Sequence, residues 1–162
     1  MKKILFTILI ALSVSVAYGG NEVIFDDWFE NRTLRINYNF VGNNKTQELS
    51  VDELISFKVW AGRRHSLYLA GNGQITMSDD ATGKVIYRTS FSSLFQEWQN
   101  TEEATRVRKS FENVFLLPFP KKPVKIELTL CNSRRDVTSK LIHRVDPKDI
   151  LIRNIDNASK YD

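Results

Sequence analysis

Strict alternation of apolar and polar side chains is the feature of this chain that most narrows its fold. The run LRINYNF at residues 34–40 puts leucine, isoleucine, tyrosine and phenylalanine on one side and arginine and asparagine on the other. The runs VKIELTL at 124–130 and VTSKLIHRV at 137–145 show the same period. Because successive side chains of a β-strand point to opposite faces, this period of two predicts half-buried strands.

Some of these strands are close enough in sequence to form hairpins. Residues 132–136 separate the second and third runs and are expected to reverse the chain. Another hairpin is predicted from residues 74–77 and 84–89, with residues 80–83 as its turn. Gly83 stands where such a turn requires a positive φ, which glycine adopts without steric cost.

Short helices are predicted between the strands. Ser50 and Glu53 have the spacing of a capping box, so a helix of about two turns is expected there. Ser93 and Gln96 give a similar signal for a second helix, and Thr101 is placed to cap a further turn.

Roughly six or seven short strands, without alternation of strands and long helices, predict an all-β fold. We expect an antiparallel β-sandwich, immunoglobulin-like or jelly-roll-like, with one to three short helices, at residues 20–152. Pro118, Pro120 and Pro123 are expected to prevent regular pairing until the next strand. Residues 149–152 would add an edge strand, and residues 153–162 have the polar character of a linker or tail.

The amino terminus predicts export. Lys2 and Lys3 precede an apolar run at residues 4–17 that ends in small residues, as in a secretory signal peptide. We place the signal peptide at residues 1–19, with cleavage before Tyr18 or Gly20. The run is shorter than the roughly 20 apolar residues that a membrane span needs. The mature protein is therefore expected in the periplasm or outside the cell, without a membrane contact.

Charge and cysteine content limit the partners and the chemistry. The formal net charge is +4 and falls to +2 once Lys2 and Lys3 are removed, so nucleic acid is not expected as a partner. Cys131 is the one cysteine in the sequence. An intramolecular disulfide is therefore impossible, a cysteine-based zinc site is unsupported, and a buried thiol is expected.

The search for catalytic motifs yields no constellation. His65 and His143 lie far apart in the sequence and outside any HExxH motif. His143 shares the apolar face of its strand, which favours a hydrogen-bonded histidine of the core or of an interface. The stretch GNG at 71–73 lacks the spacing of a phosphate loop and is expected to be a tight turn. We therefore predict no catalytic residue, no metal ligand and no cofactor.

Two groups of residues, one charged and one aromatic, allow more than one interpretation. Arg63 and Arg64, with the adjacent His65, lie in a predicted loop where solvated surface is the default, although clustered cations would bind an acidic partner. The aromatic side chains of Trp60, Phe95 and Trp98 are expected to be buried. If exposed, the same rings would offer a platform for sugars.

Several ordered segments resemble the amino-terminal domain of IgA-peptidase-like secreted zinc metallopeptidases of the Bacteroidetes type. They are residues 60–64 (WAGRR), 71–75 (GNGQI), 87–98 (YRTSFSSLFQEW), 111–113, 116–118, 121–123 and 149–152. The resemblance covers about residues 29–152 and implies a β-sandwich that precedes a zinc-peptidase domain. The zinc ligands and the general base belong to that second domain, so no catalytic residue is carried over to this sequence.

The leading functional hypothesis is a non-catalytic accessory domain that packs against or positions a peptidase domain, in cis in the family and in trans for a separate chain. The expected contact surface comprises Arg63, Arg64 and His65 together with Asp149 and Ile150. One alternative is a free-standing secreted module that binds glycan or protein, which exposed tryptophans beside a groove would favour. The other is an unrecognised hydrolase, which requires Arg63, His65 and a carboxylate in one pocket.

Overall fold

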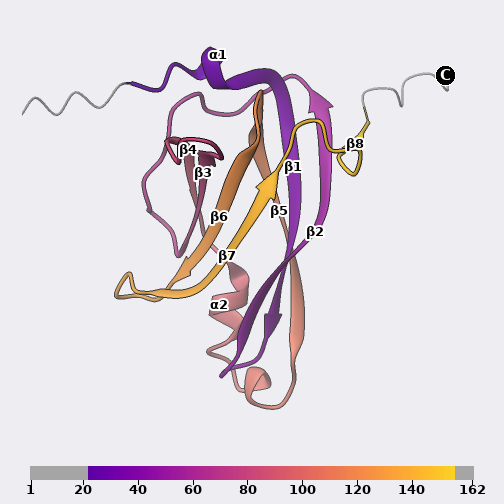
Figure 1. The fold of residues 1–162 in the computed structure, drawn as a ribbon. Coiled ribbons are helices and arrows are strands. Elements are labelled where there is room, and N and C mark those ends of the chain that lie inside the picture. Colours follow the sequence, from indigo (N-terminus) through magenta and orange to yellow (C-terminus); the bar gives the residue numbers. More distant parts are fainter. Residues whose placement is uncertain (1–21, 156–162) are drawn as a thin grey trace, which may run out of the picture.

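Two four-stranded sheets packed face to face make up most of the protein (Figure 1). The computed structural model describes residues 22–155. The first sheet is ordered β5 (Lys109–Pro120), β1 (Phe29–Gly42), β2 (Gln47–Lys58) and β8 (Arg153–Asn154). The second is ordered β4 (Val85–Phe91), β3 (Gly73–Asp79), β6 (Val124–Cys131) and β7 (Val137–Val145). The predicted all-β sandwich is confirmed, whereas the predicted signal peptide at 1–19 lies outside the described residues.

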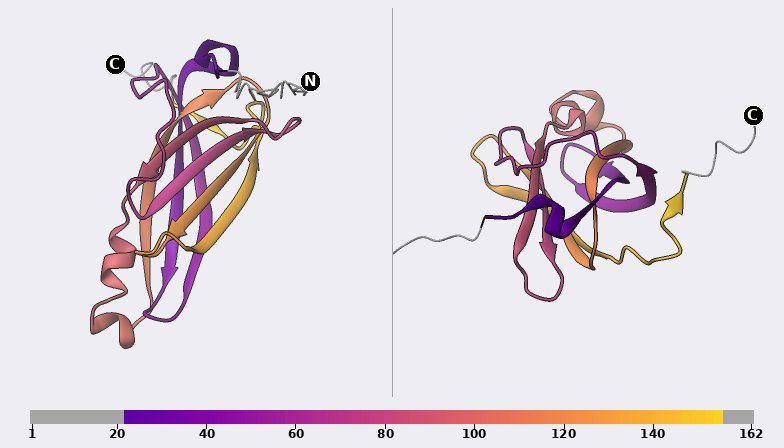
Figure 2. Two further views of the ribbon diagram at one scale, coloured as in Figure 1. Left: turned by 90° about the vertical axis from the view of Figure 1, so that its left-hand side faces the viewer. Right: turned by 90° about the horizontal axis from the view of Figure 1, so that it is seen from above.

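Neighbouring strands are antiparallel, except that β8 runs parallel to β2. Three short helical segments complete the fold: α1 (Phe25–Trp28), α2 (Leu94–Trp98) and the 3-10 turn η1 (Glu103–Thr105). Figure 2 shows α1 at one end of the sandwich and α2 with the β1–β2 turn towards the other. The two ends therefore present different segments of the chain.

The predicted alternation along β1 builds one half of the core. Leu34, Ile36, Tyr38 and Phe40 all have an exposed fraction of 0%. Side chains of β3 and β6 from the other sheet, including Leu128, belong to the same cluster. Burial of each such side chain contributes about 1.5–3 kcal/mol, so the facing strands hold the two sheets together.

Both predicted hairpins are confirmed. In the turn between β3 and β4, Gly83 has a φ of +72°, the positive value that we predicted for this position. The carboxylate of Asp79 accepts hydrogen bonds from the backbone N and the hydroxyl of Thr82, at 3.0 and 2.6 Å, which fixes this turn. Between β6 and β7 the side chain of Asn132 accepts from the backbone N of Arg134 and of Asp136.

The prediction of a helix at Ser50 and Glu53 is wrong, because both residues lie within β2. Ser50 pairs with Asn39, and the pairing of β2 with β1 extends from Gln47 to Lys58. Around the supposed cap, half-buried residues of β2 alternate with exposed ones. A capping signal carries only local information, and a long partner strand outweighs it by supplying a continuous ladder of hydrogen bonds.

Two further expectations on strand ends are corrected. Pro118 and Pro120 do not stop pairing, since β5 continues to Pro120 opposite the beginning of β1. As an outer strand, β5 tolerates residues that lack a backbone N–H. Residues 149–152 form turns instead of an edge strand, and the short strand β8 follows them.

The second predicted helix is confirmed as α2. The Ser93 hydroxyl accepts a hydrogen bond from the backbone N of Phe95 at 3.1 Å. Phe95 is fully buried, whereas Trp60 and Trp98 are half-buried and pack against the core with one edge exposed. Cys131 is a buried free thiol, as expected. Among residues 22–155, none of the helices has the length and apolar character needed to cross a membrane.

Phe95→Ala is expected to lower the free energy of unfolding by about 3–5 kcal/mol, because it removes a fully buried ring and leaves a cavity. Leu94→Ala is the matched control on the same helix, since Leu94 is 70% exposed and should cost no more than about 0.5 kcal/mol. Urea denaturation followed by tryptophan fluorescence measures both values. Equal midpoints for the two variants would contradict the assignment of Phe95 to the core.

Candidate functional site

The two segments of the expected contact surface lie at the same end of the sandwich. The loop at residues 59–72 leaves the end of β2, and residues 146–152 connect the end of β7 to β8 (Figure 1). β8 then pairs with Ile55 and Ser56 near that same end of β2. α1 lies at this end too, immediately before β1. We call α1, residues 59–65 of the loop and residues 146–152 the α1 end of the sandwich.

Arg64 is held against α1. Its guanidinium nitrogen donates to the two carboxylate oxygens of Asp26 at 3.0 and 3.1 Å, and the group lies 5.0 Å from the centre of the Phe25 ring. Both ends of this ion pair are exposed, so its contribution to stability is small. Its structural effect is to fix the course of the loop over α1.

Arg63 anchors the loop through its backbone. Its carbonyl accepts hydrogen bonds from the Trp60 indole at 3.1 Å and from the Tyr87 hydroxyl at 3.4 Å. Burial raises the pKa of the Tyr87 hydroxyl, an effect that the charge of Arg63 partly opposes. Tyr87 therefore remains protonated and can donate this bond at neutral pH.

An apolar pocket of about 320 Å³ lies beneath this part of the loop. The walls of the pocket include Trp60 from the loop, Tyr87 from β4 and Leu116 from β5. Trp60 meets Tyr87 edge to face, with ring centres 6.3 Å apart. Gly62 is needed here, because a Cβ at this position would lie 2.3 Å from the Trp60 ring. The arrangement suits an apolar side chain of a partner more than a charged group.

His65 takes no part in this pocket. It is exposed, and the pocket lining includes Arg63 but neither His65 nor a carboxylate. The convergence that the hydrolase alternative required is therefore not found among residues 22–155. No group of three or more potential metal ligands occurs in that part of the chain either.

Asp149 and Ile150 lie in a turn that exposes two apolar side chains. The Asp149 carboxylate accepts from the backbone N of Leu151 at 2.9 Å, which stabilises the turn locally. Ile150 is 94% exposed and Leu151 is 78% exposed, whereas Ile152 packs against the core. Adjacent side chains of this kind are unfavourable in water and typical of a contact with another surface.

His143 is the interface histidine that its strand position predicted. Its Nε2 and the Tyr38 hydroxyl are 2.7 Å apart, which links β7 to β1 across the two sheets. Burial lowers the pKa of His143 below its ordinary value of 6.5 and raises the pKa of Tyr38. Both groups are therefore neutral at pH 7, and the hydroxyl can donate to the ring nitrogen.

Sequence reasoning missed the pocket and the exposure of Leu151. Tyr87 belongs to a predicted hairpin strand and Leu116 to one segment of the family resemblance, but no local signal shows that β4, β5 and the loop meet. The exposure of Leu151 had a partial signal, because Ile150 and Leu151 follow Pro147 in a segment without alternation.

The chain matches the model of a known protein family. The model of the family described as peptidase M64 N-terminus matches residues 24–142. The match covers most of the described sandwich, including the Trp60 pocket and Tyr38, and it ends one residue before His143. The search of curated proteins found no match.

Replacement of His143 by Gln is expected to reduce the acid sensitivity of folding. The unfolded chain protonates this histidine near pH 6.5, whereas burial holds the folded-state pKa lower, so stability falls as the pH decreases below 6.5 towards the folded value. Wild type and His65→Gln, the exposed control, should lose the same stability between pH 7.5 and pH 5 in urea titrations. His143→Gln should lose less, and an unchanged loss would argue against a buried neutral histidine.

Proposed function

Because this chain belongs to the family of peptidase M64 N-termini, which are IgA-peptidase-like, we propose that it is a non-catalytic accessory domain that docks against and positions a peptidase domain. The accessory domain would then influence catalysis by stabilising and orienting the neighbouring peptidase domain. The observation that carries this proposal is the exposed apolar pair Ile150 and Leu151 at the α1 end of the sandwich.

The path of the chain supports this location. In a longer protein with a catalytic domain after this fold, the polypeptide would continue from β8. Asn154 at the end of β8 pairs with Ser56, so the connection leaves the sandwich at the α1 end. A tethered domain therefore meets this end at a high effective concentration.

Ile150 and Leu151 supply the apolar contact. Transfer of a large apolar side chain from water to a buried site contributes about 1.5–3 kcal/mol. Their turn is held by Asp149, so little conformational freedom is lost when they are covered. We assign these two side chains to the centre of the interface.

The Trp60 pocket and the nearby cations complete the surface. An aromatic pocket that receives one apolar side chain is the usual setting of an interface hot spot. Arg63 lines this pocket and would place a positive charge at its rim, whereas the charge of the adjacent Arg64 is paired with Asp26. Such a rim favours a partner with acidic residues and accelerates encounter more than it adds affinity.

The alternative of a free-standing glycan- or protein-binding module has less support. It relied on exposed tryptophans beside a groove, but Trp60 and Trp98 are half-buried. Trp60 lines only the pocket of about 320 Å³, which is at the lower limit for small-molecule sites. The accessory role makes use of both the pocket and the exposed turn.

Export is part of the proposal, because a positive pair at Lys2 and Lys3 and an apolar run open the sequence. Mass spectrometry of the protein secreted by its native host should find an amino terminus at Tyr18 or Gly20. Retention of Met1 in the exported fraction would exclude this part of the proposal.

Replacement of Ile150 and Leu151 by Asp is expected to weaken association with a catalytic domain of the same family about tenfold or more, equivalent to about 1.4 kcal/mol. The control is a chain with Leu94→Asp and Ile142→Asp, two side chains that are 70% and 54% exposed but lie away from the α1 end. Isothermal titration calorimetry with the separately expressed catalytic domain measures both affinities. Equal affinities, or no association of the unchanged chain, would reject this interface.

A further inference from the structure

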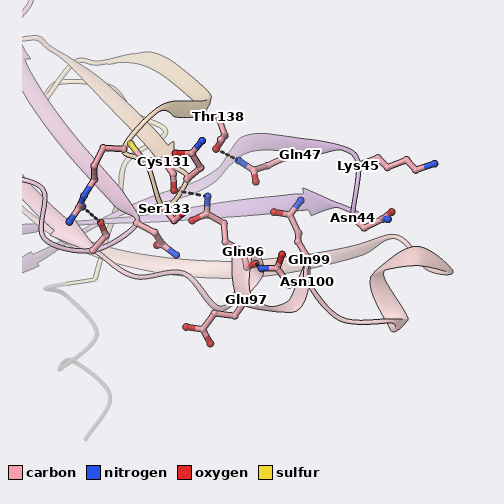
Figure 3. A pocket seen from close by; sticks show the side chains of 14 residues that line it. Asn44, Lys45, Gln47, Gln96, Glu97, Gln99, Asn100, Cys131, Ser133 and Thr138 are labelled. Carbon is pink, nitrogen blue, oxygen red and sulfur yellow. Dashed lines mark hydrogen bonds between the residues drawn. The ribbon is translucent and has the colours of Figure 1, made fainter.

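A second hollow of the described surface lies away from the α1 end, beside α2. It is a groove of about 890 Å³ between α2, the β1–β2 turn, the end of the 59–72 loop and the β6–β7 loop (Figure 3). Its volume falls within the roughly 300–1,000 Å³ of ligand sites. None of the residues of the proposed docking surface lines it. The groove is therefore a separate feature from the proposed docking surface.

Primary amides dominate the lining. Seven of the fourteen lining residues are asparagine or glutamine: Asn44, Gln47, Asn72, Gln96, Gln99, Asn100 and Asn132. Figure 3 shows Gln47, Gln96 and Gln99 grouped between α2 and the segment that carries Thr138. Each primary amide presents two N–H donors and one carbonyl acceptor to its surroundings. These amides thus combine both kinds of hydrogen-bonding group and carry no charge themselves.

Several of these amides are fixed by their nitrogens, which leaves their oxygens available. Gln96 donates to the backbone carbonyl of Cys131 at 3.2 Å, Gln99 donates to that of Asn43 at 2.8 Å, and Gln47 donates to the Ser139 hydroxyl at 2.7 Å. The oxygen of Gln96 is buried and has no hydrogen-bond partner among the described residues. A buried acceptor without a donor costs about 1–3 kcal/mol. A turn of the Gln96 side chain that brings this oxygen to the groove surface would let a ligand N–H recover that cost.

The charges at the groove do not suit a polyanion. Lys45 and Glu97 have opposite charges and point outward at the rim (Figure 3). The guanidinium of Arg135 is already engaged, because it donates to the backbone carbonyl of Gly71 at 2.7 Å. Arg135 also adopts a left-handed backbone with φ 71°. Nucleic acid and sulfated polymers are therefore unsuitable ligands.

Aromatic rings are absent from the described residues that line the groove. Sugar-binding sites generally use such rings to cover the apolar face of a pyranose, whereas a polypeptide main chain needs no ring. A main chain offers N–H donors and carbonyl acceptors at regular intervals, which matches fixed amide side chains. Hydrogen-bonding chemistry without stacking thus favours peptide over glycan.

We propose that the amide groove beside α2 binds an extended polypeptide segment through its main chain. The source of such a segment, an unfolded stretch of a protein substrate, rests on the proposed accessory role beside a peptidase. The binding chemistry itself does not, because it depends only on Asn44, Gln96 and the neighbouring amides. Main-chain contacts make the groove tolerant of sequence, so it would hold varied substrates for a catalytic domain at the other end.

The direct test uses the ¹⁵N-labelled chain and an uncharged acetylated and amidated nonapeptide of alanine, serine and threonine. The side-chain amide resonances of Gln96 and Asn44 should shift on titration, and those of Gln74, an amide outside the groove on β3, should not. An analogue methylated at all its backbone nitrogens lacks the N–H donors, and it should bind about tenfold more weakly or worse. Equal binding of both peptides would overturn main-chain recognition.

Variants locate the site. Asn44→Ala and Gln96→Met should each raise the peptide dissociation constant about 3- to 10-fold, and Gln74→Ala should leave it unchanged. Asn44 is exposed and its side chain has no partner among the described residues, so its removal should not perturb folding. Absence of peptide binding, unchanged affinity of both groove variants, or binding of an N-acetylglucosamine hexamer in place of the peptide would each reject the proposal.

The outcome is independent of the docking surface. The chain with Ile150→Asp and Leu151→Asp should keep full affinity for the peptide, whereas the groove variants should keep full affinity for the catalytic domain. Failure of peptide binding with intact docking would remove the groove proposal alone. Failure of docking with intact peptide binding would remove only the proposed interface.

Discussion

The pairing of β1 on both sides is the constraint on which the rest of the structure depends. β1 forms hydrogen-bonded ladders with β2 and β5, and its inner side chains, such as Ile36 and Phe40, are fully buried between the sheets. This strand also carries Tyr38, whose hydroxyl meets His143 of the opposite sheet. The central strand therefore sets both the register of one sheet and its position on the other.

The two ends of the sandwich have different physical chemistry. At the α1 end, Ile150, Leu151 and the aromatic walls around Trp60 present apolar surface to the solvent. Beside α2, the groove presents fixed neutral amides such as Gln96 and Gln99. Apolar surface is suited to a lasting contact between domains, and amides are suited to a reversible contact with a main chain. The proposed docking of a catalytic domain and the proposed binding of a peptide therefore use separate parts of the domain.

Prediction from sequence succeeded where a local pattern and a long-range contact agreed. The alternation at 34–40 and the turn glycine Gly83 were both confirmed, since strand faces and positive φ follow from side-chain type. It failed at Ser50 and Glu53, where a local helix signal met the ladder offered by β1. It failed again at Pro120, because tolerance of proline depends on whether a strand is at an edge, which no local pattern contains. The resemblance to the peptidase amino terminus, in contrast, was confirmed by the family match.

The sequence by itself determined the class of fold, the lone thiol of Cys131 and the family, because alternation, composition and ordered motifs are properties of the chain itself. Only the tertiary structure decided which surfaces are available. Gln96 and Gln99 are adjacent on α2 by helical spacing, but Gln47 and Asn132 reach the same groove through the packing of distant turns. The Trp60 pocket likewise requires β4, β5 and the loop to converge. Such sites depend on contacts between residues far apart in the sequence, and a single sequence contains no local signal for those contacts.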